Sequence, residues 1–394
     1  MWRKRLGWLL CRSAGDWPLL CLLAMTLVSL LVSPLPGSSL RAALPLVLGL
    51  VAYALMARWP TTAARLYWSW WGLILVGMLL SLLGPPGMLP PKHALFRRLP
   101  FLRQLGGYLP DTFNQNVIAG TLVVLLPFAV ARALLGWPPI RVEGGPPTGI
   151  EGWHRGSRWS WVAWGTSLLA SLAMMLVLSL TSSRGAYLAT AVSLLLLAGL
   201  SWPKARPALA LGVVVAAVAV VAWLGWRGVG HALLTNGAIL TLDQRLEIWS
   251  RALSIIQDFP FTGIGIGCFQ AVVARIYPLF LISKGTVSHA HNLYLQVAVD
   301  LGLPGLAAYL AILGIAAHQA IGAYRRLIFQ QERHLGLLPA ACLSSLVGMC
   351  VHGFLDSAVW GNKGAFIPWI VLGLCVALHD FGHDRMMSSP IVHQ

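Results

Sequence analysis

Apolar runs that are each long enough to cross a membrane dominate this chain. A helix needs about 20 apolar residues to span a hydrocarbon core about 30 Å thick. We expect about ten spans, near residues 17–32, 42–57, 66–83, 117–135, 159–180, 186–202, 208–226, 293–317, 337–355 and 365–379. The first run is too long for a removed signal peptide and has no small-residue cleavage site, so we interpret it as a permanent helix.

The low content of charged residues supports the same interpretation. Of the 394 residues, 57% are hydrophobic and 10% are charged, whereas soluble domains carry about 25% charged residues. A surface that faces water cannot be built from this composition. The predicted fold is therefore all-α: a polytopic membrane helix bundle of about ten transmembrane helices with a long periplasmic loop.

The positive charge of the chain indicates its orientation in the membrane. The formal net charge is +16, but the basic residues are scattered over short loops and form no stripe, so we expect no nucleic-acid partner. Arg3, Lys4, Arg5 and Arg12 precede the first span, which places the N-terminus in the cytoplasm by the positive-inside rule. An even number of spans returns the C-terminus to the same side.

Two long hydrophilic stretches divide the chain. Residues 1–226 are expected to hold seven spans and an outer loop over 84–115, residues 227–290 a periplasmic loop, and residues 291–394 three further spans and a cytoplasmic tail. Within the periplasmic loop, helical periodicity over 242–256 puts Leu246, Trp249, Leu253 and Ile256 on one face. The glycine run 263–267 that follows lacks the Lys-Ser/Thr pair of a phosphate loop, so we interpret it as a turn for close packing.

Counting spans brings three candidate functional residues to the outer face. Arg184 lies in a tight turn between two spans, Arg245 at the start of the loop helix, and His291 at the outer end of the eighth span. Arginine presents a fork of donors that suits a diphosphate, and histidine exchanges a proton near physiological pH. The three together indicate chemistry on a phosphorylated substrate.

Simpler roles for these side chains stay open. An arginine at a helix end can snorkel to lipid headgroups, and a histidine at the interface can be a hydrogen-bonded anchor. His289 and His291 have the spacing of a zinc pair, but no cysteine or carboxylate cluster in the sequence completes a tetrahedral set. Because Asp-x-Asp also occurs nowhere, we expect no metal and no cofactor.

The segments around these residues resemble one known family. His291-Asn292, nine residues and then Gly302-Leu303-Pro304-Gly305 is similar to the C-terminal signature of O-antigen ligases and O-antigen polymerases. The stretch from Arg245 to Gly265 looks like the periplasmic loop of that family, and Ser183–Leu188 resembles its R-x-x-x-L element. The matches span roughly residues 110–310 in the same order.

The resemblance implies an activity and a role for each residue. It implies a bacterial inner-membrane glycosyltransferase of the membrane C fold type, which moves a glycan from an undecaprenyl-diphosphate donor to a glycan, lipid or protein acceptor without metal and with inversion. His291 would be the catalytic base, Arg184 and Arg245 would hold the diphosphate, and Asn292 would contribute to substrate binding. The chain departs from the family at Asp300, where glutamate is common, and in its smaller number of spans.

Two other functions are open to a chain of this kind. A transporter of a small anion such as bicarbonate would also use outer arginines, but it predicts repeats or polar residues deep in the spans, and the sequence shows no repeat. A membrane scaffold without catalysis predicts no special role for His291. Membrane lipids are partners in every case.

Overall fold

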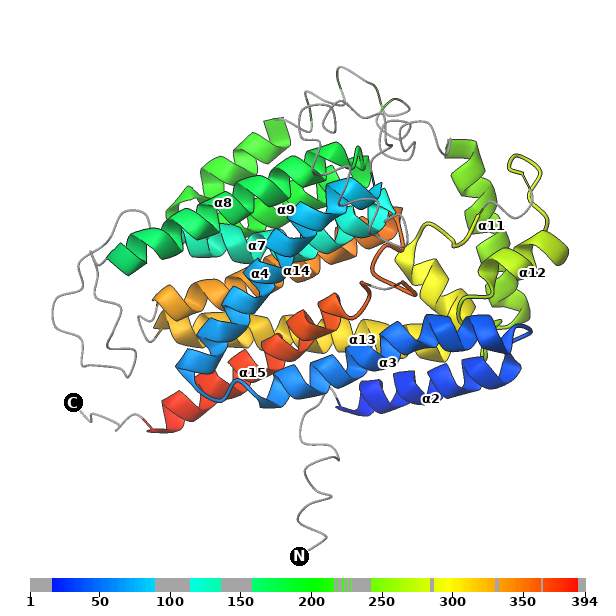
Figure 1. Cartoon of the computed structure of the whole chain (residues 1–394), viewed down its shortest axis with the longest axis horizontal. Helices are drawn as coiled ribbons and strands as arrows, with labels where there is room; N and C mark the ends of the chain where they lie inside the picture. Colours follow the sequence, from blue (N-terminus) through cyan, green and yellow to red (C-terminus); the bar gives the residue numbers. More distant parts are fainter. Residues whose placement is uncertain are drawn as a thin grey trace, which may run out of the picture. The chain divides into compact units, whose positions relative to one another are not determined.

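Every regular element in the described part of the chain is a helix. The computed structural model describes residues 16–88, 114–135, 158–215, 242–283, 287–329, 333–362 and 364–388, with the isolated positions 218, 222, 225 and 228. The helices are α2 (Asp16–Val32), α3 (Pro36–Arg58), α4 (Ala63–Met88), α7 (Gln115–Leu135), α8 (Arg158–Leu180), α9 (Arg184–Ser201), the 3₁₀ helix η1 (Pro203–Ala205), α11 (Leu242–Asp258), α12 (Phe269–Arg275), α13 (Leu293–Phe329), α14 (Arg333–Leu355) and α15 (Ile367–Ser388), drawn in Figure 1.

The helices confirm an all-α multi-pass membrane protein. Within the described residues, seven helices are long and apolar enough to cross a membrane: α3, α4, α7, α8, α9, α13 and α14. Asp16–Val32 and Ile367–His383 are shorter apolar helices. Nine of the ten expected spans therefore coincide with described helices. The remaining one, 208–226, is helical over residues 208–215 and is described only at isolated positions after that.

The chain forms two compact units that are interleaved in sequence. Unit 1 comprises Met1–Ala57, Val220–Gln319 and Cys350–Val376, and unit 2 comprises Arg58–Ala219, Ala320–Met349 and Ala377–Gln394. The division of the sequence at residues 226 and 290 stays a prediction. His291 and Arg245 belong to unit 1, whereas Arg184 belongs to unit 2.

Unit 2 is built around α7. The side chains of Leu122, Leu125 and Phe128 are fully buried, as expected of a helix with neighbours on all sides. Hydrogen bonds from small or amphipathic side chains to backbone carbonyls connect the helices. Trp70 of α4 donates to the Phe128 carbonyl at 2.8 Å, and Ser345 of α14 donates to the Val124 carbonyl at 2.7 Å.

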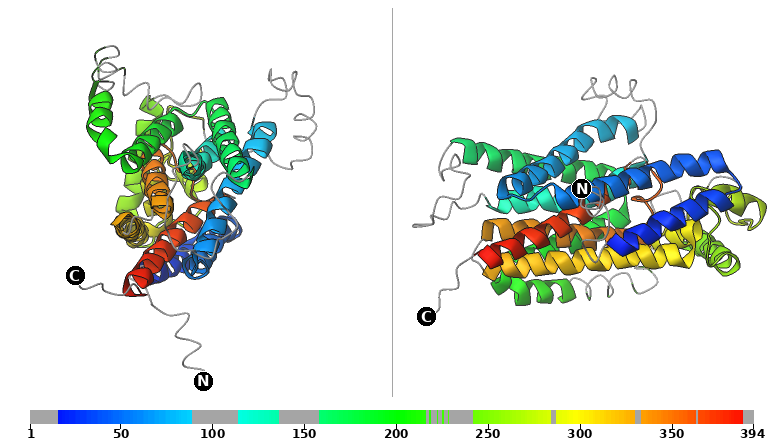
Figure 2. Two further views of the ribbon diagram at one scale, coloured as in Figure 1. Left: turned by 90° about the vertical axis from the view of Figure 1, so that its left-hand side faces the viewer. Right: turned by 90° about the horizontal axis from the view of Figure 1, so that it is seen from below.

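Unit 1 contains α2 and α3, which run side by side (Figures 1 and 2), and the predicted loop helix, which is confirmed as α11. The apolar face identified from the sequence is not the face of α11 that is most deeply buried. Leu246 and Leu253 are about half exposed, while Arg245, Ile248, Ala252 and Ile255 are buried. The helix is thus rotated by about one residue from the face that hydrophobicity favours.

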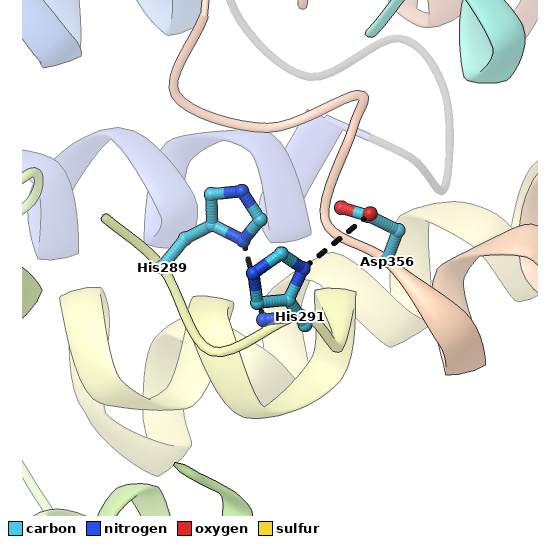
Figure 3. Close-up of side chains that lie close together, drawn as sticks. All are labelled: His289, His291 and Asp356. Carbon is cyan, nitrogen blue, oxygen red and sulfur yellow. Dashed lines mark hydrogen bonds and ion pairs between the residues drawn. The ribbon is translucent and has the colours of Figure 1, made fainter. Parts of the chain in front are cut away.

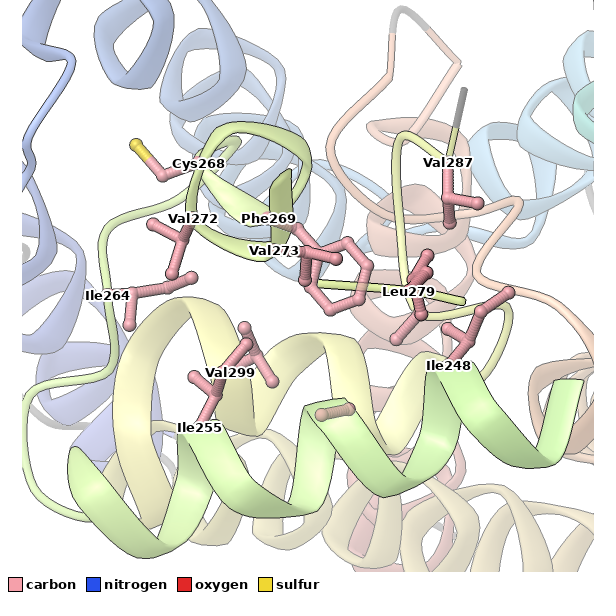
Figure 4. Packing of buried hydrophobic residues seen from close by; sticks show 12 residues of the cluster. Ile248, Ile255, Ile264, Cys268, Phe269, Val272, Val273, Leu279, Val287 and Val299 are labelled. Atoms are coloured by element: carbon pink, nitrogen blue, oxygen red, sulfur yellow. The ribbon is translucent and has the colours of Figure 1, made fainter. Parts of the chain in front are cut away.

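The reason for this rotation lies in what α11 packs against. Ile248 and Ile255 join a cluster with Phe269 and Val272 of α12 and Val299 of α13 (Figure 4). The same face carries Arg245, which makes a buried hydrogen bond to the backbone. Tertiary packing therefore overrides the apolar periodicity of the isolated segment.

The glycine turn after α11 is confirmed, and its segment is hydrogen-bonded to α13 at a break in that helix. Gly302 has φ 71° and ψ 178°, so α13 consists of two helical segments on either side of it. The Ile264 amide donates to the Val299 carbonyl at 2.9 Å, and the Leu303 amide donates to the Pro260 carbonyl at 2.7 Å. The break separates a short helix that follows His291 from the long apolar segment.

Two glycines in this contact have no room for a side chain. A Cβ on Gly302 would lie 2.6 Å from the Phe261 carbonyl carbon, and one on Gly263 would lie 2.5 Å from the Val299 oxygen. Both glycines also have positive φ, which strains any other residue.

We expect Gly302→Ala and Gly263→Ala to destabilise unit 1 by about 1–3 kcal/mol each, through backbone strain and overlap. Thermal unfolding of the purified protein in detergent should show apparent melting temperatures several degrees below that of the parent. Gly314→Ala is the matched control, because it lies in the same helix with nothing within 4 Å of the added Cβ. Equal melting temperatures for Gly302→Ala and Gly314→Ala would contradict the locked turn.

Candidate active site

The candidate site begins at the turn that leads into α13. Asn292 caps the helix: its Oδ1 accepts hydrogen bonds from the amides of Tyr294 and Leu295, both at 3.0 Å. Its Nδ2 donates to the Phe354 carbonyl at 3.1 Å, which ties the turn to the end of α14. Asparagine suits this position because its short side chain satisfies amides at a helix start.

The rings of the two histidines of the turn lie against each other in a tilted arrangement. The ring centroids of His289 and His291 lie 4.1 Å apart, and the His291 amide donates to His289 Nδ1 at 3.2 Å (Figure 3). His291 adopts a φ of 48°, a left-handed conformation that is uncommon outside glycine. Such conformations persist where the surroundings impose them, and they concentrate at functional sites. The turn therefore holds His291 in a fixed orientation.

Asp356 lies opposite His291, directly after α14. Its Oδ2 is 3.5 Å from His291 Nδ1, a contact longer than an ordinary hydrogen bond (Figure 3). The other oxygen, Oδ1, accepts from the Ser357 amide at 2.7 Å, and the Asp356 amide donates to the His352 carbonyl at 2.9 Å. These bonds keep the carboxylate pointed at the imidazole.

Arg245 brings a buried positive charge to the same place. Its side chain is 1% exposed, and one terminal nitrogen donates to the Leu355 carbonyl at 2.6 Å. Its Nε is buried and has no hydrogen-bond partner among the described residues. Burial lowers the pKa of Arg245, and the nearby charge of Asp356 partly offsets that effect. A buried guanidinium with an unused donor is costly unless a ligand completes it.

A buried network of hydrogen bonds stabilises the turn that contains His289 and His291. The Ala290 amide donates to Gln296 Oε1 at 2.7 Å, and Gln296 Nε2 donates to Asp300 Oδ1 at 2.9 Å. Trp360 Nε1 donates to the other oxygen of Asp300, also at 2.9 Å. The backbone amide of Gly267 is a further hydrogen-bond donor to this carboxylate. The network connects the histidine turn, the glycine turn and the segment after Asp356.

The surroundings set the charges of the site. Burial, together with the charges of His291 and Arg245, lowers the pKa of His289 to about 4, although Asp356 opposes the shift, so His289 is neutral at physiological pH. Burial alone would raise the pKa of Asp356, but the contact with His291 and the charges of His289 and His352 outweigh it and hold this pKa below its ordinary value. The site therefore combines an ionised carboxylate, a neutral imidazole and a guanidinium.

The structure brings together some of the expected residues. His291 and Arg245 converge, as the sequence analysis predicted, around a common partner segment, Leu355–Asp356. Arg184 is the first residue of α9 in unit 2 and is exposed, and its part in the same site stays a prediction. Both ends of the Asn292 amide form bonds within the protein, and its expected contact with substrate likewise stays a prediction.

Asp356 corrects one step of the sequence argument. We expected no carboxylate near His289 and His291, yet the side chains of all three offer ligand-type atoms within 4.8 Å of one another. The carboxylate was missed because it is distant in sequence and belongs to no motif. Topology held a signal for it: Asp356 follows the ninth predicted span, which ends on the same face as His291.

One comparison with known proteins gives a match that covers part of the candidate site. The family model of the O-antigen ligase matches residues 155–310, a range that contains Arg184, Arg245, His291 and Asn292. No curated protein matches the chain. The matched range covers α8, α9, α11, α12 and the first part of α13. It therefore includes the glycine turn at residues 263–267 and the histidine turn at residues 289–291. The chain is thus a multi-pass membrane protein whose residues 155–310 are similar to the O-antigen ligase family.

Proposed function

We propose that this protein transfers a glycan from an undecaprenyl-diphosphate donor to an acceptor at the outer face of the membrane, without metal and with inversion at the anomeric carbon. The observation that carries the proposal is the buried Arg245, whose Nε has no partner in the described structure, held beside the His291–Asp356 pair. Arg245 and His291 both lie in the range that matches the O-antigen ligase family. A base and a fixed positive charge are the two groups that such a transfer requires.

The proposed reaction is a single displacement. His291 takes a proton from an acceptor hydroxyl, and the acceptor oxygen attacks the anomeric carbon as the bond from that carbon to the diphosphate oxygen breaks. The electron pair of the broken bond leaves with the diphosphate, where Arg245 neutralises the developing charge. Asp356 keeps His291 oriented and stabilises its protonated form. Arg184 would grip the same diphosphate, a role that rests on the family resemblance.

The location of the site follows from the topology proposed for the chain. With both termini in the cytoplasm, the turns before α13 and after α14 lie on the periplasmic or outer side, where lipid-linked glycans are consumed in this family. Acceptors of three classes fit the proposal: a glycan, a lipid or a protein. The match to O-antigen ligases does not favour the small-anion transporter.

Purified protein, incubated with an undecaprenyl-diphosphate glycan and a panel of glycan, lipid and protein acceptors, is expected to form a glycosylated product and to release undecaprenyl diphosphate in equal amount. The new linkage should have inverted stereochemistry. In spheroplasts, the protein is also expected to glycosylate an acceptor that cannot cross the membrane, because the proposed site faces outwards. Transfer confined to inside-out vesicles would contradict the topology, and uptake of labelled bicarbonate into proteoliposomes without any transfer would favour the transporter.

Substitution of His291 and His289 separates the base from its neighbour. His291→Ala should lower turnover by about 10²–10⁴-fold while donor binding is nearly kept, since general base catalysis contributes about this much. Asp356→Asn should lower turnover less, because the imidazole stays but loses its oriented charge partner. His289→Ala should have a mild effect. An inactive His289→Ala beside an active His291→Ala would show that the base has been misassigned.

Arg245→Lys tests the geometry of the charge. Lysine keeps the positive charge but lacks the planar fork, so we expect it to lower turnover by about tenfold or more with the lipid-diphosphate donor. Arg251→Lys is the matched control on the same helix, since the Arg251 side chain donates to the Pro278 carbonyl at 3.1 Å and lies outside the site. The measurement is the initial rate of transfer at saturating acceptor. Equal rates for the two variants would exclude bidentate binding by Arg245.

A further inference from the structure

The candidate site contains more potential metal ligands than proton transfer by His291 requires. His289, His291 and Asp356 each offer a ligand atom, and the three atoms lie within 4.8 Å of one another. A tetrahedral ion bound at about 2.0–2.1 Å by nitrogen and oxygen ligands separates those ligands by about 3.4 Å. His291 Nδ1 and Asp356 Oδ2, at 3.5 Å, already have this separation. The ligand atom of His289 lies within 4.8 Å of the other two.

Two hydrogen bonds that an ion would leave intact fix the Asp356 carboxylate and the backbone of the histidine turn. The Ser357 amide holds one Asp356 oxygen, so the oxygen that faces His291 can coordinate an ion. The Ala290 amide, bonded to Gln296, fixes the backbone between the two histidines. A set of ligands fixed before binding loses little entropy when the ion arrives.

The chemistry of the set selects the ion. Two imidazoles and one carboxylate are typical ligands of Zn²⁺, with a fourth position left for water, whereas Mg²⁺ and Ca²⁺ require mostly oxygen ligands. The charge of Arg245 acts on His289 and opposes any cation at this position. The guanidinium therefore lowers the affinity of the site for a cation. This favours reversible binding of an ion over permanent binding.

We propose that Zn²⁺ binds reversibly to His289, His291 and Asp356 and inhibits the protein by occupying its base. The ion would take the imidazole nitrogen and the carboxylate oxygen that face each other, so His291 could no longer accept a proton with Asp356 as its partner. This regulation rests on the proposed function, because inhibition has meaning only if His291 is the base. Binding of the ion itself does not depend on any activity.

Binding is tested on the purified, untagged full chain in detergent with Co²⁺ alone, whose visible absorption is intense in tetrahedral sites. We expect one equivalent of Co²⁺ to give this absorption and Zn²⁺ to displace it. His289→Ala and Asp356→Asn should each weaken binding at least tenfold. His379→Ala is the matched control: His379 Nδ1 lies 3.4 Å from Asp380 Oδ1 in a pair outside the cluster. Retained absorption in both site variants, or its loss in the control alone, would overturn the site.

Transfer assays then separate failure of the regulation from failure of the function. Zn²⁺ should lower the transfer rate and chelator should restore it, and the ratio of the two rates should move towards one in His289→Ala. Higher transfer with Zn²⁺ than with chelator would overturn inhibition and make the ion an activator. A protein that binds Co²⁺ yet transfers nothing under any condition would refute the proposed function and the inhibition while leaving the metal site in place.

Discussion

The carboxylate of Asp300 is the interaction on which the candidate site depends. It accepts hydrogen bonds from Gln296 in its own helix, from Trp360 and from the Gly267 backbone, so three segments far apart in the chain converge on one buried group. Gln296 in turn holds the Ala290 amide of the histidine turn. A buried carboxylate is costly unless its oxygens are satisfied, and here that requirement fixes the positions of all three segments. The orientation of His291 is therefore set by a group that does not contact it.

Buried charge in unit 1 is compensated within a small region. Arg245 and Asp356 are almost completely buried, and each lies in the field of the other. Leaving either one alone would cost several kcal/mol, because a single buried charge has lost its water without gaining a partner. The unused donor of Arg245 shows that compensation is incomplete, which leaves room for an anionic ligand. The unused donor is therefore available to a negative charge that the chain itself does not supply.

The sequence predicted the helices well because length and apolar content decide what crosses a membrane. It also located α11, but the apolar face that it identified, with Leu246 and Leu253, is not the most deeply buried one, which carries Arg245 and Ile248. Hydrophobicity could not reveal that a charged side chain would turn inwards to meet the Leu355 carbonyl. His291 and Arg245 could be selected as candidates from motifs, since the residues of each motif are close together in the sequence. The part played by Asp356 and the hydrogen bonds of Asp300 were not predicted, because they arise only from contacts across the fold.

The interleaving of the two units has a consequence for biogenesis. Unit 1 draws on the start of the chain, on its middle and on residues 350–376, so its packing cannot be complete while the ribosome is still making α14. Until Leu355 and Asp356 have left the ribosome, Arg245 lacks both its carbonyl acceptor and its counter-charge. Arg245 must therefore wait for these partners until the residues that follow α14 have been made. A chain truncated before Leu355 thus carries an Arg245 side chain without the two groups that compensate it in the finished fold, which distinguishes a truncated product from a finished one.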